Sequence, residues 1–147
     1  MISEELEVQI KEDLVKHEGC KTEVYLCSEG IPTAGIGHML LGVDGLEVGD
    51  DVPMEAVLEW FDGDYKEAVT DCCAVFLNFA SLPDQVKRVL VNMAFNLGRH
   101  RLSKFKNMIK AVNEGNWVKA ADEMVDSRWY NQVGNRSIEL ENWMRNA

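Results

Sequence analysis

The sequence has 147 residues, of which 46% are hydrophobic and 27% are charged, and its formal net charge is −10. This length suits one domain with a core of its own, and no apolar run is long enough to span a bilayer. The acidic balance excludes nucleic acid as a partner, because phosphate binding needs a basic footprint.

The chain opens with a predicted helix over residues 3–17. Ser3 is placed to cap it, and Glu4 and Glu5 lie in the first turn, where the positive end of the helix dipole favours carboxylates. Apolar residues recur at helical spacing, at Leu6, Ile10 and Leu14. The N-terminus lacks the basic and then apolar pattern of a signal peptide, so we expect the protein to start in the cytoplasm where it is made.

A small antiparallel sheet is predicted for residues 18–38, a stretch that contains four glycines. One strand carries Tyr25, the chain turns at 28–30, and a second strand begins at Pro32. Glu18, at the end of the first helix, would then face the same cleft as the turn. Residues 40–52 predict a further turn and a third short strand.

Helical periodicity predicts most of the remaining chain. A long helix is expected from Pro53 to about Phe76, and a second helix, expected to be the most buried element, from 81–83 to Gly98. Further helices are predicted around 105–112 and 117–125, followed by an irregular stretch over 127–134 and a last helix to about Met144. No internal repeat or linker interrupts this pattern, so we predict a single domain over residues 1–147.

Several of these residues together form a recognisable motif. Residues 18–38 combine Glu18-Gly19, Tyr25, Glu29-Gly30, Thr33 and Gly35-Ile36-Gly37-His38 at fixed spacings, and the match resumes at 92–98, at 127–132 and at Asn135-Arg136. The set resembles the active-site signature of the T-even phage lysozymes, the muramidases of glycoside hydrolase family 24. The resemblance implies an α+β, lysozyme-like fold, in which a small antiparallel sheet lobe, about 18–52, is joined by the long helix to a mainly helical lobe that includes the N-terminal helix.

The resemblance implies that Glu18 is the general acid and that Thr33 helps to hold an attacking water. Hydrolysis of a glycosidic bond needs a carboxyl group that protonates the leaving oxygen. Read alone, Glu18 is one of 25 acidic residues and suits a structural role at a helix end, and Thr33 is only a residue that favours strands. One position departs from the motif, because the family has its second catalytic residue, an Asp, where this chain has Cys27. A thiol has a reference pKa of about 8.5, which burial raises, so we expect a poor substitute for a carboxylate.

Three hypotheses remain open for Cys27. In the first, Glu18 and Thr33 suffice and the enzyme inverts the sugar configuration. In the second, the Cys27 thiolate is a nucleophile that forms a covalent sugar intermediate, so that configuration is retained. In the third, catalysis has been lost and the chain is a binding module.

The resemblance also implies residues around the acid. Met39 and Leu40 follow the glycine-rich strand at the cleft, and Phe95 and Asn96 lie where the family lines its cleft floor, although Phe95 equally suits the core. Asn96, polar on an apolar helix, is a candidate to bind an acetamido sugar. Arg136 is expected to pair with the acid, the alternative being an ordinary surface arginine at a helix start.

Other side chains are assigned structural roles. We predict that His38 makes a structural hydrogen bond to Asp64, since the far end of its strand should be remote from Glu18. Trp129 and Tyr130 are expected to pack within the helical lobe rather than stack on a sugar. Cys20, Cys27 and His38 fit no short chelating loop, so neither a metal nor a cofactor is expected.

Positive charge concentrates in one segment of this acidic chain. It contains Arg99, Arg101, Lys104, Lys106 and Lys110. A solvated helix face and a patch for anionic wall carboxylates both fit this cluster.

The implied function is that of an endolysin that hydrolyses bacterial peptidoglycan during phage-induced host lysis. We expect a monomer that is made in the host cytoplasm, does not insert in the membrane, and reaches the wall indirectly through a holin pore. The alternative is a lysozyme-like wall-binding or phage structural module, which the Cys27 position keeps open.

Overall fold

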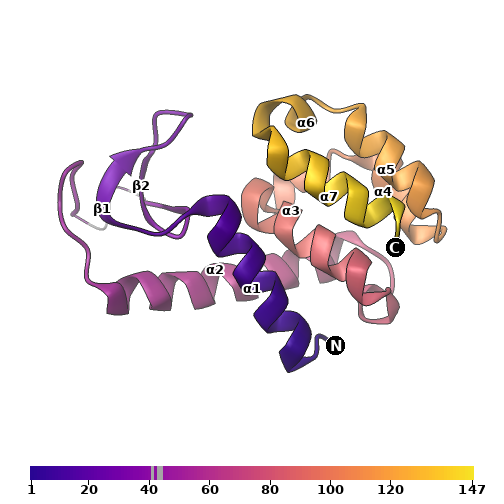
Figure 1. Cartoon of the computed structure of the whole chain (residues 1–147), viewed down its shortest axis with the longest axis horizontal. Helices are drawn as coiled ribbons and strands as arrows, with labels where there is room; N and C mark the ends of the chain where they lie inside the picture. Colours follow the sequence, from indigo (N-terminus) through magenta and orange to yellow (C-terminus); the bar gives the residue numbers. More distant parts are fainter. Residues whose placement is uncertain (41, 43–44) are drawn as a thin grey trace. The chain divides into compact units, whose positions relative to one another are not determined.

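A computed structural model describes residues 1–40, 42 and 45–147, and the chain divides into two compact units. The helical unit contains residues 1–10 and 67–147, and the sheet unit contains residues 11–66. Both boundaries fall inside helices, α1 (Glu4–Glu18) and α2 (Met54–Val75), which start and end within two residues of their predicted limits (Figure 1). The two helices therefore run through both units, and the single-domain assignment stays a prediction.

The sheet unit contains an antiparallel sheet of three strands in the order β1-β2-β3 among the described residues. The strands are β1 (Lys21–Leu26), β2 (Pro32–Gly35) and β3 (His38–Met39). The predicted hairpin between the first two is confirmed, with Tyr25 opposite Thr33 and the Cys27 N–H donating to the Ile31 carbonyl at 3.0 Å. Figure 1 shows β1 and β2 side by side.

The third strand lies earlier than predicted. It is β3, immediately after a turn at Ile36-Gly37, and the described residues of 40–52 form no strand of their own. Gly35 and Gly37 have φ values of +65° and +64°, which reverse the chain directly after β2. From the later stretch, Asp51 forms an isolated bridge with Glu23, while residues 41, 43 and 44 lie outside the described part.

The two faces of this sheet carry different side chains. Val24 and Ala34, which are 1% and 0% exposed, lie on one face. Tyr25, Thr33 and Met39 are consecutive partners across the three strands, so their side chains lie in one row on the other face. Cys27, the residue after β1, is near this row, because its sulfur is hydrogen-bonded to the Thr33 hydroxyl.

The helical unit is built around α3 (Asp84–Leu102). Val86, Val89, Leu90 and Met93 on this helix are fully buried, as its apolar periodicity predicts, and each such side chain stabilises the fold by roughly 1.5–3 kcal/mol. The helical backbone is interrupted at Gly98 (φ 76°, ψ 167°) as predicted, but it resumes and continues to Leu102.

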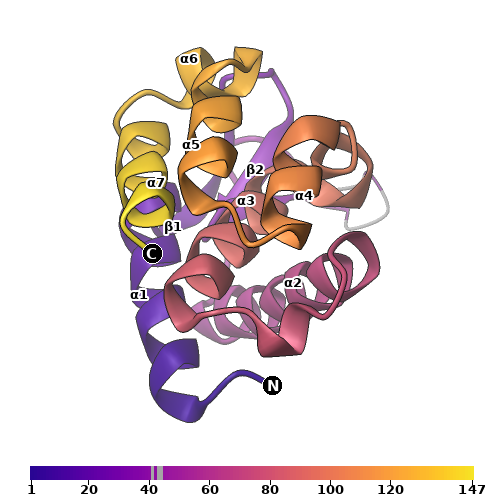
Figure 2. The ribbon, with the colours of Figure 1, turned by 90° about the vertical axis from the view of Figure 1, so that its right-hand side faces the viewer.

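Four further helices follow α3 among the described residues: α4 (Lys106–Asn113), α5 (Trp117–Val125), α6 (Arg128–Val133) and α7 (Asn135–Arg145). A short 3-10 helix, η2 (Phe79–Ser81), precedes α3. Figure 2 shows α5 between α4 and α7, and it packs against both. None of the helices described combines the length and the apolarity needed to cross a membrane.

The prediction of an irregular stretch over 127–134 is wrong. The chain forms α6 there, because the Ser127 hydroxyl accepts a hydrogen bond from the Tyr130 N–H at 3.1 Å and caps the helix. Gly134 (φ 60°) then separates α6 from α7. The helix is six residues long, too short for a periodic pattern to reveal it.

Candidate active site

Glu18 is the last residue of α1, where Gly19 (φ 75°) ends the helix. Its side chain is partly exposed, and its carboxyl group packs against the backbone of Gly37. A Cβ at position 37 would lie 2.8 Å from Glu18 Cδ and 2.9 Å from Oε1. A glycine is therefore required in the β2–β3 turn, both for its positive φ and for the room it leaves to the carboxyl group.

The Cys27 thiol has a lowered pKa, which corrects the expectation of a raised one. Burial alone raises this pKa, but hydrogen bonds to the sulfur from the backbone N–H groups of Ile31 and Glu29 and from the Thr33 hydroxyl together outweigh it. The turn after β1 thus directs donors at the sulfur and favours the thiolate. Cys27 is also partly exposed, so the burial on which the prediction relied is limited.

Thr33 connects the thiol to the turn. Its side chain is 2% exposed, and its hydroxyl donates to the Ile31 carbonyl at 2.8 Å. A hydroxyl has one proton, so it cannot donate to this carbonyl and to Cys27 at the same time. The Ile31 carbonyl and the Cys27 sulfur therefore compete for the hydroxyl proton.

Tyr25 belongs to the same group of side chains. The pKa of its phenol is raised, first by burial and then by the negative charges of Glu18 and Cys27. Sequence reasoning named Tyr25 only as part of the motif and missed it as a site residue. The signal was its position two residues before Cys27, since side chains at i and i+2 of a strand share a face.

The predicted hydrogen bond between His38 and Asp64 is confirmed. The Nδ1–Oδ2 distance is 2.7 Å, and the imidazole stacks on Trp60 with ring centroids 4.5 Å apart. The argument that this end of the motif is remote from Glu18 was wrong, because the residue directly before His38 is Gly37, which contacts the Glu18 carboxyl. His38 therefore anchors the turn to α2 within the sheet unit.

The two predicted substrate residues of the sheet unit differ in exposure. Met39 is 49% exposed and lies beside Thr33 in the cross-strand row. Leu40 is 6% exposed, and its N–H donates to the Pro32 carbonyl at 2.8 Å. Met39 thus presents a side chain on the face with Cys27, whereas Leu40 contributes mainly to the core.

The predicted site residues of the helical unit lie on α3 and α7. Phe95 and Asn96 are partly exposed, and the Asn96 carbonyl accepts from Trp129 Nε1 at 2.8 Å. The predicted packing role of Trp129 is confirmed, because it is 3% exposed and meets Phe105 edge-on. Asn96 therefore uses its carbonyl within the fold, and its NH2 group is the part that suits a sugar acetamido oxygen.

Arg136 is buried, so the alternative prediction of an ordinary surface arginine is wrong. It is 8% exposed, and its Nε donates to the Asn92 side-chain carbonyl at 2.9 Å. Arg136 lies in the helical unit and Glu18 in the sheet unit, and their ion pair stays a prediction.

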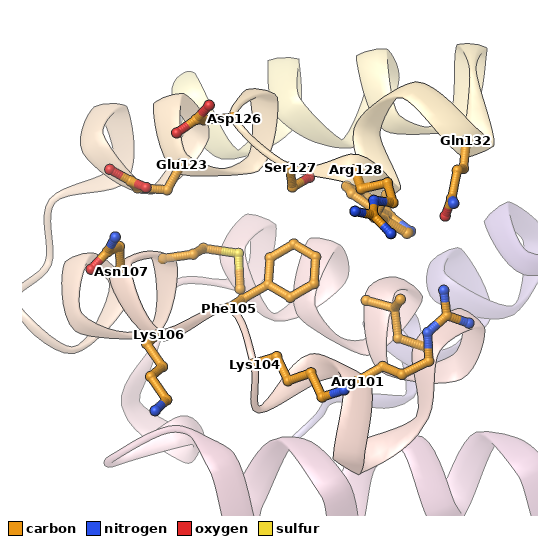
Figure 3. Close-up of a pocket in the computed structure, with 13 residues that line it drawn as sticks. Arg101, Lys104, Phe105, Lys106, Asn107, Glu123, Asp126, Ser127, Arg128 and Gln132 are labelled. Carbon is orange, nitrogen blue, oxygen red and sulfur yellow. The ribbon is translucent and has the colours of Figure 1, made fainter.

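A pocket of about 500 Å³ lies within the helical unit. Figure 3 shows Phe105 amid its side chains, with Arg101 and Lys104 on one side and Arg128 and Gln132 on the other. Part of the predicted basic cluster, Arg101, Lys104 and Lys106, lines this pocket, whereas Arg99 pairs with Asp71 at 3.0 Å. Glu123 and Asp126 also line the pocket, so its charge is mixed.

Comparison with known proteins gives the family. The family model described as phage lysozyme matches residues 15–145. The chain is 30% identical to "Probable T4-type lysozyme 1" of Dictyostelium discoideum, over 87% of this chain and 88% of that protein.

Two phage proteins match over a smaller share of their own length. The chain is 28% identical to the "Pre-baseplate central spike protein Gp5" of Enterobacteria phage T4, over 90% of this chain and 27% of that protein. It is 25% identical to the "Peptidoglycan hydrolase gp36" of Pseudomonas phage phiKMV, over 86% of this chain and 14% of that protein. The extent of the family match, together with the helical fold and its small antiparallel sheet, shows that the chain belongs to the phage lysozyme family and is a hydrolase of the lysozyme type.

Proposed function

We propose that the protein is a muramidase, which hydrolyses the β-1,4 bond between N-acetylmuramic acid and N-acetylglucosamine in bacterial peptidoglycan. The observation that carries the proposal is the group formed by Glu18, Cys27 and Thr33 within one unit. It combines a carboxyl group, which can give a proton, with a thiol whose environment favours the anion, which can accept one. Relatives named as T4-type lysozyme and as peptidoglycan hydrolase support the substrate.

The proposed reaction uses both groups. Glu18 gives its proton to the glycosidic oxygen as the bond between that oxygen and C1 breaks. Water, held in place by the Thr33 hydroxyl, attacks C1 from the opposite face. One proton of this water passes to the Cys27 thiolate. Glu18 is then reprotonated and Cys27 deprotonated by solvent, so one water is consumed and the enzyme is unchanged.

The lowered pKa of Cys27 supports its use as a base, but the same thiolate suits a nucleophile. The anomer of the first product separates the two routes. Direct attack by water on an equatorial bond gives an axial hydroxyl, whereas a covalent intermediate on sulfur gives an equatorial one. Proton NMR during digestion of a defined wall fragment measures this, and we expect the axial product.

We further propose a role in phage-induced lysis of the host, which is consistent with a phage relative named as a peptidoglycan hydrolase. In that role a monomer made in the host cytoplasm reaches the wall through a holin pore. The name of the spike relative supports a second candidate, a place in the phage particle, either as an enzyme or as a wall-binding part without catalysis.

The deciding experiment compares wild type with Glu18→Gln on purified peptidoglycan, measuring the release of reducing ends. We expect the variant to be slower by a factor of about 10² to 10⁴, because general acid catalysis is lost. Glu12→Gln, an exposed change on the same helix, is the matched control and should leave the rate unchanged. Wild-type turnover equal to that of Glu18→Gln, with binding to the wall retained, would favour the binding module.

A further inference from the structure

Tyr25 shares the sheet face that carries the candidate catalytic group. It is the direct cross-strand partner of Thr33, and Thr33 is in turn the partner of Met39. Direct partners in an antiparallel pair have Cβ atoms about 4.5–5.5 Å apart. Cys27 directly follows β1, and its sulfur is hydrogen-bonded to the Thr33 hydroxyl, so Tyr25 and Cys27 are both neighbours of Thr33.

The phenol is also coupled electrostatically to both ends of the site. The charges of Glu18 and Cys27 add to burial in raising its pKa. The hydroxyl consequently stays protonated across the neutral range, where it is a hydrogen-bond donor. A neutral hydrogen-bond donor is suited to stabilising both groups when they are negative, Cys27 as the thiolate and Glu18 as the carboxylate.

A lysine side chain also contacts the Tyr25 ring. Lys21 Nζ lies 4.5 Å from the centroid of the Tyr25 ring, within the range of a cation–π interaction. This contact restricts the ring and places a positive charge beside it. Glu18 and Cys27 act electrostatically on Tyr25, and Glu29 acts on Cys27.

We propose that Tyr25 is a positioning residue of the hydrolase site, whose hydroxyl orients and stabilises the anionic forms of Glu18 and Cys27 during turnover. The inference rests on the proposed muramidase function. The physical reason is that Glu18 becomes a carboxylate when it gives up its proton. A hydrogen-bond donor that is already in place stabilises this negative charge. Tyr25 acts through these two residues and is not required to touch the sugar.

The test is Tyr25→Phe, which keeps the ring and the lysine contact and removes only the hydroxyl. We expect kcat on peptidoglycan to fall about tenfold, which corresponds to 1.4 kcal/mol, with KM changed less than twofold. The pH profile of kcat should also shift. Tyr65→Phe is the matched control, because Tyr65 lies in the same unit and has Lys11 over its ring at 4.9 Å. It should leave kcat and the pH profile unchanged.

A second readout does not depend on activity. Iodoacetamide alkylation of Cys27, followed by peptide mass spectrometry across pH, reports the fraction of thiolate. Loss of the Tyr25 donor should raise the midpoint of this curve, while Tyr65→Phe should leave it in place. Unchanged kcat, pH profile and alkylation midpoint in Tyr25→Phe would overturn the inference.

The two proposals fail in different ways. If Glu18→Gln matches wild type on peptidoglycan, the muramidase proposal fails, and the alkylation midpoint still decides whether Tyr25 acts on Cys27. If Glu18→Gln is inactive and Tyr25→Phe equals wild type in every readout, only the Tyr25 inference fails. Lys21→Met supplies a second variant with the hydroxyl intact, and a loss of kcat smaller than that of Tyr25→Phe supports the inference.

Discussion

The carboxyl group of Glu18 rests on the backbone of Gly37, so closely that a Cβ at position 37 would lie 2.8 Å from Cδ. The end of the first helix and the turn between β2 and β3 are thereby fitted to each other within the sheet unit. The position of the proposed acid depends on a glycine 19 residues further along the chain. This relationship leads to the first prediction.

Gly37→Ala should lower activity far more than stability. The positive φ makes a side chain cost roughly 1–2 kcal/mol, and the new methyl group also displaces the Glu18 carboxyl. A displacement of about 1 Å can reduce catalysis about 10²-fold. Gly45→Ala is the control, because Gly45 has a φ of +68° but no atom within 4 Å of its Cβ position. Equal activity of both variants on peptidoglycan, at equal stability in urea, would contradict the close packing of the Glu18 carboxyl group on Gly37.

Thr33→Val should raise the pKa of Cys27, because one of the donors that favour the thiolate is lost. Alkylation of Cys27 near neutral pH should slow accordingly, and its pH midpoint should move up. Thr22→Val, an exposed change on β1, should leave both unchanged. Peptide mass spectrometry distinguishes Cys27 from the exposed Cys20 and Cys73.

The same lowered pKa predicts how Cys27 affects stability with pH. A folded-state pKa below the unfolded value stabilises the fold fully above the unfolded value, and this contribution disappears as pH falls through the folded value. The difference in unfolding free energy between wild type and Cys27→Ser should therefore grow as pH rises toward the ordinary thiol pKa. Urea denaturation at a series of pH values measures it, and a constant difference would contradict the shift.

Glu18→Gln should lower the pKa of the Tyr25 phenol, because burial and the Glu18 charge both oppose the phenolate. Absorbance at 295 nm follows the ionisation, and Tyr25→Phe identifies the contribution of Tyr25. The change should be downward, toward the ordinary value of 10.0. Glu12→Gln should not move it, and an unmoved Tyr25 titration in Glu18→Gln would show that the two groups are uncoupled.

The His38–Asp64 hydrogen bond should be measurable in a double-mutant cycle. His38→Phe keeps a ring on Trp60 and removes the bond, and Asp64→Asn changes the partner. We expect a coupling of about 1–2 kcal/mol, because both groups are more than two-thirds buried. The exposed pair Lys66–Asp62 should give a smaller coupling in the same experiment. Equal coupling in the two cycles would mean that burial does not strengthen the histidine pair.

Local patterns predicted most of the helices and the first hairpin. The limits of α2 followed from Pro53 and its periodic apolar residues, and the β1–β2 hairpin from the turn residues at 28–30. The prediction failed where tertiary or capping contacts decided the outcome, as for β3 directly after Gly37 and for α6 capped by Ser127. For Arg136, the structure excludes only the alternative of a surface arginine, because its guanidinium is buried against Asn92.

Residue types and their spacing were enough to identify Glu18, Cys27 and Thr33 and the family to which they point. Spacing along the chain is a local property, and helices and hairpins follow from it. The lowered pKa of Cys27, and the raised pKa of Tyr25 to which the charges of Glu18 and Cys27 contribute, could be found only from the folded chain. The reason is that ionisation depends on donors and charges brought within a few ångströms by folding, such as the N–H groups of the turn after β1, and no residue's identity specifies that arrangement.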